Sequence, residues 1–210
     1  MIAVIDYDVG NLFSLQASLR ALGIETVLTR DPDVIHRADG IILPGVGAFG
    51  DAADHLDRYH LKTCLQQEAA DGKPFLGICL GMQLLFEESG EYGRHEGLGL
   101  LKGSVKSMRE AIKDPEAIVP HMGWNELVIN RDDTVTQSLP EHPFVYFVHS
   151  FYATDCEESL VAYAEYEGLK VPAIVAKGNV FGMQFHPEKS GAVGLGLLAE
   201  FAKMCGVKHR

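Results

Sequence analysis

The segment of residues 74–86 constrains the fold of this chain more than any other. Apolar residues at 75–78 predict a buried strand, and a helix-like pattern begins directly afterwards, so Cys79 lies at the apex of a strand–turn–helix unit. Gly77 and Gly81, two residues to either side, allow a tight bend without a Cβ clash. Such a unit predicts an α/β sheet with the cysteine at the carboxyl end of a strand.

The rest of the first half alternates strands with helices. Apolar runs predict strands at residues 2–5, 25–28, 40–43 and 75–78. Helices are expected over residues 12–22, where Asn11 is the N-cap candidate and Gly23 ends the helix, and over residues 51–70. Near-continuous apolar strands that alternate with helices are typical of a parallel sheet covered on both faces.

The second half is richer in strands. Candidates are residues 126–129, 144–148, 160–165, 173–177 and 180–184, and a last helix is expected over 192–204. Gly178-Asn179 between the last two strands is typical of a hairpin turn. No repeat or linker divides the chain. We therefore predict one domain, residues 1–210, with a doubly wound, mostly parallel sheet flanked by helices and extra antiparallel strands in the second half.

Composition excludes several function classes. The net charge is −11 and no basic run occurs, which argues against nucleic-acid or anionic-membrane surfaces. No apolar run approaches the roughly 20 residues that cross a bilayer, and the first 20 residues do not resemble an export signal. We expect a cytoplasmic protein with reduced thiols. The four cysteines form no C-x-x-C pair, so a zinc or redox motif is not indicated.

Cys79 has the setting of a nucleophile. A helix N-terminus favours a thiolate, and the same turn leaves the N–H of Leu80 free to face an oxyanion. A base and an orienting group are available in His186 and Glu188, which directly follow the predicted strand at 180–184. The plain alternatives are a cysteine packed in the core and a capped surface turn at His-Pro-Glu. A metal site at His186 and Glu188 lacks further ligands.

Three other segments combine glycine or aromatic residues with polar groups. The turn at residues 44–50, Pro-Gly-Val-Gly-Ala-Phe-Gly, follows a strand, and its N–H groups could complete an oxyanion hole with Leu80; a plain turn is the alternative. No Gly-Lys-Ser/Thr follows it, so a phosphate loop is disfavoured. Residues 120–125 and 146–152 suit a binding surface, although core packing is an equal alternative for Phe147, Phe151 and Tyr152.

Two motifs resemble those of the class I, or triad, glutamine amidotransferases: Gly77-x-Cys79-x-Gly81-x-Gln83 and Phe185-His186-Pro187-Glu188. Within that class, four segments are similar to those of the glutaminase subunits of imidazole glycerol phosphate synthases, from histidine biosynthesis. These segments are residues 44–51, 120–125, 146–150 and 186–190. Many members of the class have a Gly-Gly-Pro oxyanion turn where this chain has residues 44–51. The resemblance covers essentially the whole chain.

The resemblance implies a flavodoxin-like amidotransferase fold and hydrolysis of L-glutamine. Cys79 would attack the side-chain amide, with His186 as base and then acid and Glu188 as orienter. A γ-glutamyl thioester forms, ammonia leaves and water releases glutamate, with no cofactor or metal. The implied oxyanion-hole N–H groups are those of Val46 and Leu80. The implied glutamine-binding residues are Gly47, Gln83, Glu91, Ser150 and Phe151.

The resemblance also implies a partner, a (β/α)₈ barrel cyclase subunit that receives the ammonia. There it reacts with a phosphoribosyl-formimino-aminoimidazole-carboxamide ribotide, and the heterodimer acts as a lyase that yields imidazole glycerol phosphate and an aminoimidazole carboxamide ribotide. Positions that match cyclase-facing residues are Asn11, Trp124, Tyr146 and Lys189. Such subunits are nearly inactive until the cyclase is bound and liganded, and we expect a peptide flip at Gly45-Val46 to underlie this.

One departure and three alternatives accompany this interpretation. The first loop has Asp8 where relatives often have glycine, and aspartate tolerates unusual backbone angles better than most residues. Another amidotransferase, or a hydrolase of γ-glutamyl amides, would share the triad but not the four segments. A receiver-like signalling module could use Asp6 and Asp8, but Leu43-Pro44-Gly45 stands where its phosphoacceptor would be. A catalytically dead homologue conflicts with an intact triad.

Overall fold

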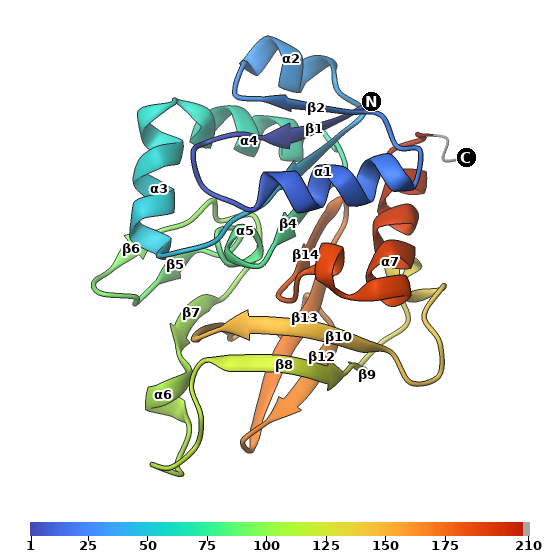
Figure 1. Cartoon of the computed structure of the whole chain (residues 1–210). Coiled ribbons are helices and arrows are strands. Elements are labelled where there is room, and N and C mark those ends of the chain that lie inside the picture. The colour runs from blue at the N-terminus through green and yellow to red at the C-terminus, as the bar shows by residue number, and fades with distance from the viewer. Residues whose placement is uncertain (208–210) are drawn as a thin grey trace.

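A computed structural model describes residues 1–207 of the chain, and its centre is an eight-stranded sheet (Figure 1). The strand order is β2 (Thr26–Thr29), β1 (Ile2–Ile5), β3 (Gly40–Leu43), β4 (Phe75–Ile78), β14 (Val180–Met183), β13 (Leu169–Lys177), β12 (Leu160–Tyr166) and β9 (Val128–Ile129). The first five strands in this order are parallel and the others pair antiparallel. The predicted fold class is confirmed.

The strands β1, β3 and β4 are buried along their whole length, which is why their sequences are continuously apolar. The helices are α1 (Leu12–Ala21), α2 (Pro32–Arg37), α3 (Phe49–Arg58), α4 (Leu61–Ala70), α5 (Leu80–Gln83), α6 (Met108–Ala111) and α7 (Gly191–Met204), with short 3₁₀ turns η1 (Thr134–Thr136) and η2 (Pro187–Lys189). Alternate strand residues contact α1 and α7 on one face and α2, α3 and α4 on the other. Figure 1 shows α1 and α7 together on the nearer face.

Two smaller sheets extend the domain beyond the central one. The strands β10 (Phe144–His149) and β8 (His121–Glu126) form an antiparallel pair. A four-stranded sheet contains β11 (Phe151–Thr154), β7 (Ser104–Ser107), β5 (Glu88–Ser89) and β6 (His95–Glu96). The predicted hairpin at Gly178-Asn179 is confirmed, because it joins β13 to β14 and Gly178 has a φ of +61°.

Three predictions about the elements were wrong in whole or in part. The helix expected over 51–70 is two helices, because His60 adopts a left-handed conformation with a φ of +56° and interrupts the helix there. The strand expected at 126–129 is replaced by β8, which begins earlier, and by the separate β9. Asn11 precedes α1 as expected, but its side chain makes no capping hydrogen bond.

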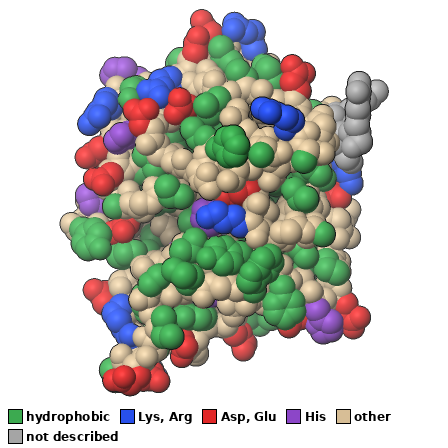
Figure 2. Space-filling view, in the orientation of Figure 1, with side chains coloured by type: hydrophobic (Ala, Val, Ile, Leu, Met, Phe, Trp, Pro, Cys, Tyr) green, Lys and Arg blue, Asp and Glu red, His purple; other side chains and the backbone are tan. Residues whose placement is uncertain are grey.

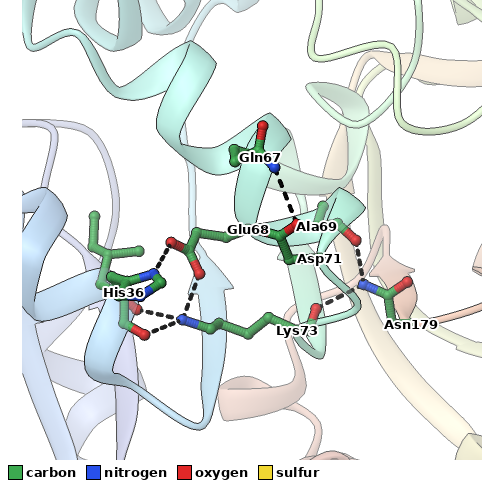
Figure 3. Close-up of polar contacts among 8 residues, drawn as sticks. His36, Gln67, Glu68, Ala69, Asp71, Lys73 and Asn179 are labelled. Carbon is green, nitrogen blue, oxygen red and sulfur yellow. Dashed lines mark hydrogen bonds and ion pairs between the residues drawn. The ribbon is translucent and has the colours of Figure 1, made fainter.

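The amino ends of the strands are fastened by a polar cluster (Figure 3). Glu68 on α4 is nearly buried and contacts His36 Nδ1 at 2.8 Å and Lys73 Nζ at 2.6 Å. Asn179, in the β13–β14 turn, donates from Nδ2 to the carbonyls of Ala69 and Lys73 at 2.8 and 2.7 Å. The cluster therefore joins α2, α4, the start of β4 and the hairpin at the edge opposite the carboxyl ends.

Candidate active site

Cys79 lies in a strained turn between β4 and α5. Its φ of +55° and ψ of −112° are unusual for a residue with a side chain. The glycines on either side are required by space: a Cβ on Gly77 would lie 2.5 Å from Gly81 O, and one on Gly81 would lie 1.8 Å from Leu43 O. The prediction of a tight, glycine-flanked turn at the cysteine is confirmed.

The electrostatic support for Cys79 differs from the expectation. A four-residue helix has few aligned peptide dipoles, so the helix N-terminus is a minor influence. The stronger partner is His186, which follows β14, the parallel neighbour of β4. His186 and Cys79 therefore meet at the carboxyl ends of adjacent strands, as the sequence predicted.

His186 and Glu188 form a buried pair. His186 Nδ1 lies 2.8 Å from Glu188 Oε1, and the side chains are 4% and 3% exposed. Burial alone would lower the pKa of His186, but its contacts with Cys79 and Glu188 outweigh burial and raise that pKa to about 9. A cationic imidazole beside the sulfur favours a thiolate, which is the reactive form of a cysteine. The geometry therefore supplies a nucleophile, a proton acceptor and an orienting carboxylate.

The other cysteines lack such a setting. Burial raises the pKa of both Cys156 and Cys205 to about 12, and it also raises the pKa of Cys64. All four thiols are free. Cys79 is thus the residue on which nucleophilic chemistry can centre.

A cavity of about 460 Å³ opens at Cys79, a volume suited to a small molecule. It brings together most of the residues expected from the sequence: Val46, Gly47, Cys79, Leu80, Gln83, Glu91, Ser150, Phe151, His186 and Lys189. Glu188 lies outside this lining, behind His186. Pro120, from the 120–125 segment, also lines the cavity, as does Tyr92, which no feature of the sequence singled out.

Glu91 connects the cavity to helix α3. Its Oε2 accepts a hydrogen bond from Phe49 N at 2.8 Å, which replaces the cap that Ala48 cannot provide. Burial, the largest influence, raises the pKa of Glu91 against the opposing effect of the Phe49 N–H. The side chain is therefore held in place at the cavity wall.

The turn at residues 44–50 faces Leu80. Tyr7 donates its buried hydroxyl to Pro44 O at 2.6 Å, and a Cβ on Gly45 would lie 2.9 Å from Leu80 Cβ and from Gly81 N. Gly47 has open space around it and a φ of +98°. Gly45 is thus required by packing and Gly47 by backbone conformation. Leu80, as the first residue of α5, has an N–H without a partner inside the helix.

The first loop confirms the expectation for Asp8. This residue has a φ of +66°, a conformation that aspartate tolerates. Its carboxylate contacts Arg30 Nη2 at 2.8 Å and accepts a hydrogen bond from Tyr59 OH. The substitution for glycine is therefore accommodated, and the loop leads directly to Asn11.

The β8–β10 pair borders the cavity through Val148 and His149 and carries exposed apolar residues, which form the rim. Trp124 is 54% exposed and packs edge-on against Tyr146, its cross-strand neighbour, with ring centroids 6.0 Å apart. Met122, on the same strand, is also exposed. Figure 2 shows green side chains gathered below the centre of this face, over the β8–β10 region. Asn11 and Val46 line a small recess next to Glu188.

The structure adds one functional candidate that the sequence did not identify. Gln184 is fully buried and lies beside Cys79, and its only sequence signal was its place in the strand that leads to His186. His149, already noted among the unusual segments, lines the cavity. Within residues 1–207, no group of three or more His, Cys, Asp or Glu side chains is placed to hold a metal ion. Among the helices of this part of the chain, none has the length and apolar character of a membrane span.

Comparisons with known proteins agree with this geometry. The family model described as "Glutamine amidotransferase class-I" matches residues 3–203. Imidazole glycerol phosphate synthase subunit HisH from Oceanobacillus iheyensis is 50% identical over 204 residues, which cover 97% of this chain and 99% of the relative. The subunit of that name from Bacillus licheniformis is 52% identical over 203 residues, covering 96% and 95%.

Solved structures share the fold at low identity. One titled "Crystal structure of glutamine amidotransferase" has a TM-score of 0.76 and 20% identity, with coverage of 99% of this chain and 100% of the other. One titled "Structure of PurLQS from Thermotoga maritima" has a TM-score of 0.73 and 22% identity, with coverage of 96% and 97%.

Proposed function

Because the chain belongs to the class-I glutamine amidotransferase family, we propose that it is the glutaminase subunit of an imidazole glycerol phosphate synthase. The observation that carries the proposal is the strained Cys79 turn with the His186–Glu188 pair at the same sheet edge. The identity of 50% and 52% to relatives named HisH, over nearly the full length of the chain, supports this branch of the family over other amidotransferases.

The chemistry follows from the contacts. Cys79 passes its proton to His186, which Glu188 stabilises as a cation, and the thiolate attacks the side-chain amide carbon of L-glutamine. The N–H groups of Val46 and Leu80 hold the oxyanion. His186 returns the proton to the leaving nitrogen, so that ammonia departs as the C–N bond breaks. Water then releases glutamate from the γ-glutamyl thioester, again with His186 as base.

The cavity wall binds the substrate in this proposal. Gly47, Gln83 and Glu91 hold glutamine together with backbone near Ser150 and Phe151. The carboxylate of Glu91, fixed by the Phe49 N–H, suits the substrate's α-ammonium group. The Phe151 carbonyl already accepts two hydrogen bonds, so other backbone groups of this segment contact the ligand.

We further propose that the exposed rim docks a (β/α)₈ barrel cyclase and that ammonia passes into it. Trp124 and Tyr146 offer the aromatic area typical of an interface anchor, and Asn11 and Lys189 lie beside the same opening. A heterodimeric, cytoplasmic biosynthetic enzyme would result. The Gly45-Val46 peptide is a candidate gate, although Gly45 lacks the room that an alanine test would need.

The test is release of glutamate and ammonia from glutamine. The purified chain is assayed alone and then with the cognate cyclase and its ribotide ligand, with Cys79→Ala as control. We expect low activity alone and a large rise in the complex that Cys79→Ala abolishes. Full activity without the partner, or none in any mixture, would contradict the proposed function.

A further inference from the structure

Gln184 is a buried polar residue that the proposed triad does not use. It follows β14 by one position and has no exposed surface. Its Nε2 lies 3.8 Å from Cys79 Sγ, a contact that the large radius of sulfur permits. Its Oε1 accepts a hydrogen bond from Gln83 Nε2 at 3.0 Å. A fully buried amide is expected to have partners at both ends, and one of these partners is the nucleophile.

The Phe151 carbonyl fixes the direction of this chain of amides. A carbonyl oxygen only accepts, so the Gln83 end that lies 3.0 Å from Phe151 O must be its nitrogen. The second hydrogen on that nitrogen then points to Gln184, which must present its oxygen. Gln184 is left with its N–H₂ group toward the sulfur. No other orientation of the two amides satisfies all three contacts.

Two buried histidines hold the carbonyl in place. His149 Nδ1 donates to Phe151 O at 2.8 Å, and His149 Nε2 lies 3.1 Å from His121 Nδ1. The two histidines face each other across the β8–β10 pair. Burial is the main cause that lowers the pKa of both histidines, that of His149 to about 3. The carbonyl therefore has two fixed donors and little freedom to turn.

We propose that Gln184 is a further catalytic residue, whose amide N–H donates to the Cys79 sulfur in an orientation set by the Phe151 carbonyl through Gln83. This deepens the proposed function, since it adds a donor to the nucleophile of that reaction. When the thiol proton moves to His186, the negative charge on sulfur is stabilised by the amide. When the S–C bond forms, the charge moves to the substrate oxygen and the contact becomes a weaker, neutral one.

Alkylation of Cys79 by iodoacetamide tests this without glutamine or a partner. The rate is measured from pH 6 to 10 on the peptide that contains Cys79, in the wild type, Gln184→Met and Gln184→Glu. Loss of a charge-assisted donor lowers the thiolate population, so we expect about a tenfold slower reaction at pH 7. The difference should close at high pH, where the thiol is ionised in every variant.

A matched control and a second variant make the outcome decisive. Gln137→Met changes an exposed glutamine and should leave the rate unchanged. Circular dichroism checks that each variant folds. If Gln184→Met does not fold, the result for Gln184→Glu decides. That variant keeps the shape of the side chain but places a carboxylate oxygen, an acceptor, beside the Cys79 sulfur. Folded variants with wild-type rates throughout would overturn the proposal. Because no glutamine is used, this result is independent of whether the glutaminase assay succeeds.

Discussion

At the scale of single residues, the reactivity of Cys79 depends on what surrounds it rather than on the thiol itself. Three other cysteines in the chain have pKa values raised by burial, whereas Cys79 lies beside a histidine whose pKa is raised to about 9. The carboxylate of Glu188, almost without exposed surface, contributes to that shift. A small chemical change at the His186–Glu188 pair should therefore have a large effect on the rate of glutamine hydrolysis.

Glu188→Gln should slow glutamine hydrolysis in the complex by about 10²-fold or more. The substitution keeps the size of the side chain but removes the charge that favours the cationic form of His186, so the pKa of His186 should fall. Steady-state kinetics over pH 6–10 measure the rate, and NMR titration of His186 measures its pKa. Glu158→Gln, at an exposed position, is the control; equal losses in both variants would contradict this account.

At the scale of elements, the strand–turn–helix unit is built so tightly that glycine is required. Gly81→Ala should cost about 3 kcal/mol or more, because its Cβ would lie 1.8 Å from Leu43 O and the turn must move. Gly196→Ala, in the middle of α7, would place a Cβ in ordinary contact with Ser138 Oγ at 3.6 Å, so it should be neutral or stabilising by up to about 1 kcal/mol. Urea unfolding compares the two, and a Gly81→Ala variant as stable as Gly196→Ala would refute the packing argument.

The cluster around Glu68 should make the free energy of unfolding depend on pH in the acidic range. Burial alone would raise the pKa of Glu68, but Lys73 and His36 outweigh burial and lower it below its ordinary value of 4.5. A lowered folded-state pKa means that this stabilisation is present above about pH 4.5 and is lost as the pH falls further. Lys73→Met should therefore cost about 2 kcal/mol at pH 7 and progressively less below pH 4.5.

The control for that cluster is Lys203→Met, which breaks an exposed ion pair with Glu200 and should cost under about 0.5 kcal/mol. Urea unfolding at pH 7, 5 and 3.5 provides the comparison. A loss for Lys73→Met that stays constant over this range would show that the carboxylate does not titrate as described.

The sequence predicted those elements whose signal is local. The strands β1, β3, β4 and β14 are continuous apolar runs, and the turn at Cys79 is marked by glycines that the packing requires. The break between α3 and α4 was missed because a histidine, not a glycine or proline, adopts the left-handed conformation there. The strands β5 and β6 were missed because two residues each leave no period to detect.

The site was predicted where a motif marks it and missed where only the fold creates it. Cys79, His186 and Glu188 lie in short motifs, whereas the Gln83–Gln184 contact joins residues about a hundred positions apart. The capping of α3 by Glu91 is likewise invisible without the tertiary structure. Hydrogen bonds between distant segments have no periodicity in sequence, so only the folded chain shows them.

At the scale of the whole molecule, the amino and carboxyl ends of the strands in the central sheet carry different features. The amino ends are joined by the Glu68 cluster, whereas the carboxyl ends carry the cavity and the exposed β8–β10 rim. The Glu68 cluster and the exposed rim thus lie at opposite ends of the strands. We therefore expect substitutions at the rim to weaken binding of the proposed partner more than they destabilise the fold.

Trp124→Ala should weaken binding of the proposed cyclase by about 2 kcal/mol, roughly 30-fold, and reduce activation of glutamine hydrolysis at limiting cyclase. The free-energy change of unfolding should stay near that of the wild type, because the indole is 54% exposed. Isothermal titration calorimetry gives the affinity. Leu28→Ala, on the edge strand β2, is the control; unchanged affinity for Trp124→Ala would place the partner elsewhere.

The proposed reaction passes through a covalent bond between Cys79 Sγ and the γ-glutamyl group of glutamine. The most direct test is intact-mass spectrometry of the chain, acid-quenched during turnover with glutamine, cyclase and ribotide ligand. We expect a species heavier by glutamine less one ammonia, mapped to the peptide that contains Cys79 and missing in Cys79→Ala. Turnover without such a species under any quench, or the adduct on another residue, would contradict it.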